Sequence, residues 1–252
     1  MKVAGKVVLV TGAAGAIGTE LIRAVIELGA ARVHAADLPE ALARADFSDI
    51  DAGGEIRINR VPLDVGDRAQ VDELASKATN LGLLINNAGY CRWQGALALP
   101  DPDAARREMV VNYWGPVHTC QAFAPILRET GGGIINVGAF AGLATLPAAG
   151  SYSASKAALH AFTQALRAEL APQGIPVVEA FPGPVDTTVI AGAPDFAPAS
   201  PTAVADRIIE GFEAGEEDIF PDDWSSAGFV RLRADPKAVE RDFARFAAVR
   251  PD

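Results

Sequence analysis

The sequence predicts an α/β fold in which one doubly wound parallel sheet of about seven strands carries helices on both faces. Short runs of β-branched and other apolar residues, typical of buried parallel strands, alternate along the chain with amphipathic runs of helical spacing. A glycine-rich turn and a helix directly follow the first strand, which is the order of a phosphate-binding βα unit. Because the chain has 252 residues, half of them hydrophobic, we expect residues 1–252 to form one domain.

Four strands are predicted in the first half of the chain, where apolar runs end in turn residues, amides or acids. They are Lys6–Val10, Arg32–Ala36, Ile56–Leu63 and Gly82–Ile85. Apolar residues recur at helical spacing between them, which predicts helices at Glu20–Leu28 and Arg68–Thr79, the second with Asp67 as its N-cap. The connection at 41–54 is polar and rich in small residues, as expected for a short surface helix and a loop.

The second half of the chain continues the alternation. The predicted strands are Gly131–Val137, Pro176–Phe181 and a short Asp218–Phe220. The predicted helices are Pro100–Val111, Val117–Arg128, a long helix from Tyr152 to Leu170, Thr202–Ala214 capped by Thr202, an amphipathic Trp224–Arg233 and an exposed Pro236–Val249. Ala, Gly and Pro are frequent in 190–201, so we expect a mobile loop over the substrate near 188–201. A C-terminal helical extension is expected near 224–252.

The bulk properties exclude several classes of function. A net charge of −10 argues against a nucleic-acid or anionic-membrane surface, so the expected partner is a small molecule. The two cysteines form no disulfide framework, and the three histidines match no metal-ligand spacing, so no metal is expected. The apolar run near the N-terminus is too short to span a membrane and no export signal is visible, so a cytoplasmic location is expected.

The turn Thr11–Gly18 is predicted to bind a dinucleotide. Glycines let the main chain approach a pyrophosphate, and the N-terminus of the following helix favours its negative charge. Asp37 ends the second predicted strand 19 residues after Gly18, where a carboxylate can accept hydrogen bonds from the adenosine ribose. Such a carboxylate would repel a 2′-phosphate, and no arginine lies in the turn or directly after Asp37. The sequence therefore favours NAD over NADP.

Tyr152 and Lys156 form the candidate catalytic pair. Residues four apart share one face of a helix, so the phenol and the ammonium point into the same space. A free tyrosine has a pKa near ~10, and a neighbouring ammonium is expected to lower it. Such a pair can act as a general acid and base on a carbonyl or a hydroxyl. The spacing also occurs by chance in many helices, so its meaning depends on the rest of the chain.

With these residues in view, the chain resembles the short-chain dehydrogenase/reductase family, whose fold is Rossmann-like, over about residues 6–221. The matching motifs are the turn Thr11–Gly18, Asp64-Val65, Asn86-Asn87-Ala88-Gly89, Asn112, Tyr152-x-x-x-Lys156, and Pro182-Gly183 with Thr187. The resemblance implies that Tyr152 is the acid/base, that Lys156 holds the nicotinamide ribose, and that Asn112 places a water that relays protons to Lys156. It further implies a set of cofactor contacts: Gly12, Gly15, Ile17, Gly18, Asp37, Asp64, Val65, Asn87, Tyr152, Lys156, Val185 and Thr187.

Two departures from the family pattern concern the site. Ala16 stands where the family usually has glycine, and we expect this to adjust the cofactor contacts without abolishing binding. After the fifth strand the family usually reads Asn-Val-Ser-Ser, whose second serine bonds the substrate oxygen, but this chain reads Asn136-Val137-Gly138-Ala139. Losing such a donor typically costs ~10²–10³ in rate. Nearby hydroxyls at Ser151, Ser153 and Thr145 could compensate, although a capping role is favoured for the two serines.

Three functions stay open on this basis. The first is an NAD-dependent oxidoreductase that transfers hydride between the nicotinamide and a secondary alcohol or ketone, with the missing donor supplied by the substrate or another side chain. The second is a non-catalytic NAD-binding protein, and the third is a related imine reduction or dehydration. The pocket should be largely apolar, and the candidate substrate contacts include Ala139. The other candidate lining residues are Tyr90, Trp93, Phe140, Leu143, Leu146 and Phe196. The resemblance also implies a homodimer or homotetramer.

Overall fold

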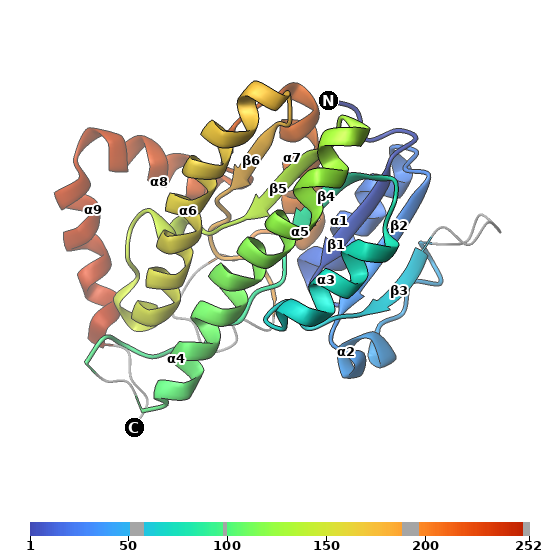
Figure 1. Ribbon diagram of the computed structural model, residues 1–252. Coiled ribbons are helices and arrows are strands. Elements are labelled where there is room, and N and C mark those ends of the chain that lie inside the picture. The colour runs from blue at the N-terminus through green and yellow to red at the C-terminus, as the bar shows by residue number, and fades with distance from the viewer. Residues whose placement is uncertain (51–57, 98–99, 188–196, 249–252) are drawn as a thin grey trace.

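The structure is a computed structural model that describes residues 1–50, 58–97, 100–187 and 197–248. At its centre lies a seven-stranded sheet in which all strands are parallel (Figure 1). The strand order is β3-β2-β1-β4-β5-β6-β7. The strands are β1 Val7–Thr11, β2 Arg32–Asp37, β3 Ile58–Pro62, β4 Leu81–Asn86, β5 Gly133–Val137, β6 Val177–Ala180 and β7 Asp218–Ile219. The predicted doubly wound sheet is therefore confirmed, and its order reverses between β1 and β4, where such folds form a cleft.

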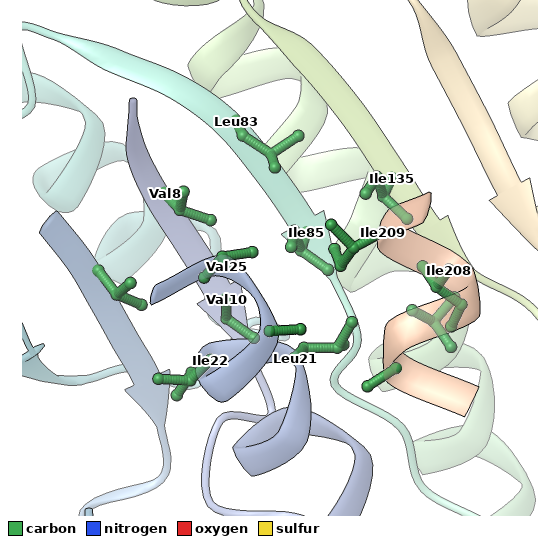
Figure 2. Packing of buried hydrophobic residues seen from close by; sticks show 14 of the residues in the cluster. Val8, Val10, Leu21, Ile22, Val25, Leu83, Ile85, Ile135, Ile208 and Ile209 are labelled. Carbon is green, nitrogen blue, oxygen red and sulfur yellow. The ribbon is translucent and has the colours of Figure 1, made fainter. Parts of the chain in front are cut away.

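Helices cover both faces of the sheet (Figure 1). On one face, α1 Ala16–Glu27 and α7 Pro201–Ala214 pack side by side, and Leu21, Val25 and Ile208 meet the strand side chains of Val8 and Ile85 in a buried cluster (Figure 2). The opposite face packs against α3 Arg68–Lys77, α5 Gly115–Thr130 and α6 Gly150–Leu170. The short α2 Pro39–Arg44 connects β2 to the loop before β3. No helix in the described ranges has both the length and the hydropathy of a membrane span.

The structure confirms one of the predicted helix N-caps and contradicts the others. Asp67 caps α3 as predicted, because its carboxylate accepts hydrogen bonds from the amides of Ala69 and Gln70. The prediction for Thr202 was wrong, since Ser200 precedes α7 and Thr202 lies inside its first turn. Ala149 precedes α6, so neither Ser151 nor Ser153 caps that helix.

The predicted break around Asn112 is absent. The helix α4 Pro102–Met109 continues through a π-helical turn, Val110–Trp114, directly into α5. A π-helical turn inserts an extra residue into an α-helix and is frequent at functional sites. Pro116 is accommodated because it stands in the first turn of α5, where its missing N–H is not needed.

The C-terminal extension packs on the sheet domain. It contains α8 Asp223–Ala234, α9 Pro236–Phe243 and a 3₁₀ turn Ala244–Ala248, and lies beside α6 at one end of the molecule (Figure 1). The last predicted helix is largely exposed, as expected, but Val239, Phe243 and Phe246 on its inner face are buried in a cluster that includes Phe140. Within the predicted segments, residues 51–54, 56–57, 188–196 and 249–252 lie outside the described ranges, so most of the proposed loop, including Phe196, receives no structural description.

Candidate active site

A cleft of about 330 Å³ runs along the carboxyl ends of the strands on both sides of the switch point between β1 and β4. Its walls contain every residue predicted to contact a dinucleotide. These are Gly12, Gly15, Ile17, Gly18, Asp37, Asp64, Val65, Asn87, Tyr152, Lys156, Val185 and Thr187. We call the part lined by residues 12–18, 36–38 and 63–65 the turn end of the cleft. The structure thus brings together residues that are spread over most of the sequence.

The glycine turn is shaped by close approaches of the main chain. Gly12 has a φ of 62°, and a methyl group on it would lie 2.7 Å from the Cα of Ala88. A methyl group on Gly18 would lie 2.1 Å from the Gly12 carbonyl oxygen. Because Gly15 is the N-cap of α1, no side chain caps this helix, and its first turn holds no acidic residue. This helix N-terminus on the cleft fits the pyrophosphate of a dinucleotide.

Asp37 and Asn87 also support the turn. The carboxylate of Asp37 accepts hydrogen bonds from the Ala14 amide at 2.9 Å and from the Leu38 amide at 2.8 Å. Each carboxylate oxygen has a further lone pair, so Asp37 can still accept a ribose hydroxyl. Asn87 donates its Nδ2 hydrogens to the carbonyl oxygens of Thr11 and Gly12, both at 3.0 Å. Its position on the cleft fits a nucleotide contact, but only through its main chain or Oδ1.

Asn112 is fully buried behind the cleft and does not line it. Its Oδ1 accepts a hydrogen bond from the Tyr90 amide at 2.8 Å, and its Nδ2 donates to the Tyr90 carbonyl at 2.8 Å and to Ser155 Oγ at 2.9 Å. Ser155 Oγ in turn donates to the Tyr152 carbonyl at 2.7 Å. Asn112 therefore fastens the loop after β4 to the first turns of α6, while its predicted part in a water relay stays a prediction.

Tyr152 and Lys156 both line the cleft, but their electrostatics differ from the prediction. The buried Lys156 Nζ donates to the Val137 carbonyl at 2.8 Å and lies 5.9 Å from the centroid of the Tyr152 ring. Burial lowers the pKa of Lys156 to about 8, although the negative charge of Glu179 acts in the opposite direction. Burial raises the pKa of Tyr152, and Cys91 and Glu108 add to this effect. The predicted lowering of the tyrosine pKa by Lys156 was therefore wrong, because burial dominates at both groups.

A second cavity of about 90 Å³ adjoins the cleft, and both are lined by Cys91, Ala139 and Tyr152. We call this part the aromatic end. Its lining includes the predicted substrate contacts Ala139, Phe140 and Leu146, and also Trp93, Trp224 and Phe243.

The side chains at the aromatic end come from distant parts of the chain. Trp224 and Phe243 belong to the C-terminal extension and pack edge-on and tilted against Phe140, at centroid distances of 5.1 and 6.2 Å. No sequence pattern pointed to Trp224, Phe243 or Cys91 as lining residues, although Cys91 closely follows the Asn-Ala-Gly loop, and that position indicates a place near the site. Of the other candidate lining residues, Tyr90 lines the main cleft and Leu143 lines neither cavity.

The hydroxyls considered as replacements for the missing serine do not reach the site. In the part of the chain that the structure describes, neither cavity is lined by Thr145, Ser151 or Ser153. Ser153 Oγ instead accepts a hydrogen bond from the Leu146 amide at 3.1 Å, which holds the loop before α6. Ala139 itself is 8% exposed and faces both cavities with a methyl group.

Comparisons with known proteins show the family to which the fold belongs. The family model of the short chain dehydrogenases matches residues 6–195. The chain is 35% identical over 197 residues to a probable oxidoreductase, EphD, of Mycobacterium tuberculosis. The match covers 76% of this chain and 33% of that protein, so the chain spans about a third of that relative's length.

Two solved structures share the fold over nearly the whole chain. A short chain dehydrogenase from Burkholderia cenocepacia, in complex with NADP, has a TM-score of 0.88 and 36% identity, with 96% of this chain and 99% of that chain covered. A short chain dehydrogenase/reductase from Burkholderia phymatum, in complex with NAD, has a TM-score of 0.82 and 26% identity, with 95% and 96% covered.

Proposed function

Because the chain belongs to the short-chain dehydrogenase family, an oxidoreductase family, we propose that it is an NAD-dependent enzyme that transfers hydride between the nicotinamide and a secondary alcohol or ketone. The observation that carries this proposal is the position of Tyr152 and Lys156. Both side chains stand in the wall of one cleft, between a glycine turn that fits a pyrophosphate and a cavity lined by apolar side chains. A bound nicotinamide supplies or accepts the hydride.

In this proposal the turn end binds the cofactor. Gly12, Gly15, Ile17 and Gly18 present the main chain and the N-terminus of α1 to the pyrophosphate. Asp64, Val65 and Asn87 line the adenine side, and Val185 and Thr187 hold the nicotinamide amide. Lys156 holds the nicotinamide ribose, because its ammonium lies in the wall between the two ends of the cleft.

We infer a preference for NAD from Asp37. Its carboxylate lines the cleft at the end of β2 and is fixed there by the amides of Ala14 and Leu38, so it cannot easily turn away from a 2′-phosphate. Repulsion between these anions disfavours NADP. Since one related structure is a complex with NADP and another a complex with NAD, the preference must be measured on this protein.

Tyr152 is proposed to move the proton at the substrate oxygen. Since burial raises its pKa, the phenol is protonated at neutral pH and can donate its hydrogen to a ketone oxygen as hydride arrives at the carbon. In the direction of alcohol oxidation, the same oxygen must first lose its proton to solvent, and it then accepts the proton of the alcohol as hydride leaves the carbon. Asn112 keeps this helix turn in register with the loop after β4.

The proposal is tested with purified protein, NAD or NADP, and a panel of secondary alcohols and ketones that differ in apolar size. We expect reduced cofactor to form with NAD and at least one alcohol, and the melting temperature to rise more with NAD than with NADP. Turnover with NADP alone would overturn the cofactor preference. Cofactor binding without turnover on the whole panel would overturn the reaction.

A homodimer or homotetramer is also proposed. Val110 and Trp114, which are 40% and 47% exposed, lie on the π-helical turn between α4 and α5. Apolar side chains exposed side by side on one helix are frequent where two copies of a protein associate. Light scattering at several concentrations tests this: a monomer at every concentration would overturn it.

A further inference from the structure

A buried carboxylate lies directly behind the cleft, in the space next to Gly138. Glu179 of β6 is fully buried, and a methyl group built on Gly138 would lie 2.7 Å from its Oε1 atom. The missing side chain at position 138 is therefore explained by the structure, because the carboxylate of Glu179 fills the space that a serine there would use. Gly138 itself lines the cleft, so only one residue without a side chain separates Glu179 from the site.

His160 holds one oxygen of this carboxylate. Its Nδ1 lies 2.9 Å from Glu179 Oε2, and the side chain of His160 is 23% exposed. The hydrogen bond to Glu179 raises the pKa of His160. Burial raises the pKa of Glu179, and the hydrogen bond and positive charge of His160 oppose that rise. His160 thus favours the ionised form of the carboxylate. The other oxygen, Oε1, has no hydrogen-bond partner among the described residues.

Lys156 reaches the same place from the same helix face. Lys156 and His160 stand four residues apart on α6, so their side chains leave the helix in the same direction. His160 contacts Glu179, while Lys156 Nζ contacts the carbonyl of Val137, the residue before Gly138. The strands β5 and β6 pair here in parallel register, with Val137 opposite Ala180, the neighbour of Glu179. The ammonium and the carboxylate therefore both lie near the carboxyl end of β5, the first at Val137 and the second at Gly138.

We propose that Glu179, held by His160, is a positioning residue for Lys156, whose buried ammonium it keeps protonated and directed toward the cleft. The role of Lys156 at a cofactor ribose rests on the proposed function, but the coupling between Glu179 and Lys156 does not. Without a negative charge nearby, a buried ammonium tends to lose its proton. An uncharged lysine would then be a weaker donor to a ribose hydroxyl.

The other charged and titratable groups around this cluster do not replace Glu179. Asp218 on β7 forms an ion pair with Arg167 of α6 at 2.9 Å. Cys91 is also close enough to influence the pKa of Lys156. Burial raises the pKa of the Cys91 thiol to about 12, so this thiol is neutral between pH 6 and 9. Tyr152 is likewise protonated over this range because burial raises its pKa. Among the charged groups of the described residues, Glu179 therefore opposes the effect of burial on the pKa of Lys156 most strongly.

The experiment follows the titration of Lys156 directly, without cofactor or substrate. The protein has five lysines, at positions 2, 6, 77, 156 and 237, and Lys156 is the buried one, so ¹³C labelling of the lysine Cε atoms gives an NMR spectrum that can be assigned with Lys156→Met. We expect the Glu179→Gln variant to titrate at Lys156 about one pH unit lower than the wild type. Glu217→Gln, which removes an exposed carboxylate close to the same strand, is the matched control and should leave this titration unchanged.

A second measurement connects the coupling to binding. The pKa of Lys156 is about 8 in the wild type, so a pKa lower by about one unit leaves far fewer of the lysines charged at pH 8. NAD binding to Glu179→Gln should therefore weaken about fivefold at pH 8. At pH 6 Lys156 is charged in both proteins, and NAD binding should be unchanged. A loss that is equal at both pH values would indicate a merely structural role and overturn the proposal. If NAD does not bind to the wild type, the proposed function fails while the NMR titration still decides the coupling.

Two further variants guard against a folding defect. His160→Gln keeps a hydrogen-bonding side chain at position 160 but removes the imidazole, and we expect it to lower the Lys156 titration by less than Glu179→Gln does. Gly138→Ser combined with Glu179→Ala fills the vacated space with a small side chain and should titrate like Glu179→Gln. An unchanged Lys156 titration in folded Glu179→Gln or in this double variant would overturn the proposal.

Discussion

The turn end and the aromatic end of the cleft are built in different ways. At the turn end, main-chain groups shape the surface: Asp37 bonds the amides of Ala14 and Leu38, and Asn87 bonds the carbonyl of Gly12. At the aromatic end, side chains from separate parts of the chain meet around Ala139, and Trp224 comes from the C-terminal extension. The difference teaches that one end constrains the sequence tightly, whereas the other can vary as long as its volume and polarity suit the substrate.

The largest effect is expected from Tyr152→Phe, which should change the reaction without changing cofactor binding at the turn end. Replacing Tyr152 with phenylalanine removes the hydroxyl between the two ends of the cleft and should reduce kcat by about 10³-fold, because a positioned acid/base contributes about 10²–10⁴. The affinity for NAD, measured by calorimetry, should change less than twofold, since the turn end is untouched. Tyr113→Phe, which alters a tyrosine that packs on Trp114 and Phe162, is the control and should keep full turnover. Equal turnover by Tyr152→Phe would contradict the proposed role.

The same difference explains what the sequence could predict. The sheet, its switch point and the turn end were predictable, because buried strands, close glycine contacts and a carboxylate at a strand end all leave local patterns. The aromatic end was only partly predictable, because the folding of the C-terminal extension onto Phe140 depends on contacts between distant residues. The raised pKa of Tyr152 was missed for the same reason, since spacing along a helix reveals a neighbour but not the degree of burial.

Lys156, which stands where the two ends meet, should give the next largest effect. Its pKa falls from 10.5 to about 8 on folding, so between these values the unfolded chain binds more protons than the native protein. The unfolding free energy of the wild type should therefore rise with pH relative to that of Lys156→Met, by about 2–3 kcal/mol between pH 8 and pH 10.5. Urea denaturation at several pH values measures this difference. The exposed Lys77→Met should show no such rise, and a flat difference for Lys156→Met would mean that burial does not perturb this lysine.

A smaller effect is expected at the turn end itself. In Gly18→Ala the new methyl group meets the Gly12 carbonyl oxygen at 2.1 Å and the Ala13 Cα at 2.9 Å, so the turn must move. We expect a loss of about 1–3 kcal/mol in unfolding free energy, typical of overpacking, together with weaker NAD binding. Gly15→Ala is the control in the same turn, because its methyl group would find its nearest neighbour at 3.4 Å and should leave stability within about 0.5 kcal/mol. Similar losses in both variants would show that the close contact at Gly18 is not the cause.

The smallest expected effect tests the aromatic end. Ala139→Ser adds a hydroxyl at a position that faces both cavities, next to Tyr152. An oxyanion donor is worth about 10²–10³ when the rest of a site is built around it. Because position 139 of this site carries only a methyl group, we expect a smaller gain, a rise in kcat of about tenfold on simple secondary alcohols. Ala141→Ser, which adds the same group elsewhere in the second cavity, is the control and should bring no gain. If Ala139→Ser brings no gain and the wild type binds NAD without turnover, the alternative of a non-catalytic NAD-binding protein is favoured.

A substrate that carries its own neighbouring hydroxyl should gain less from Ala139→Ser than a simple alcohol does, because it already supplies the missing donor.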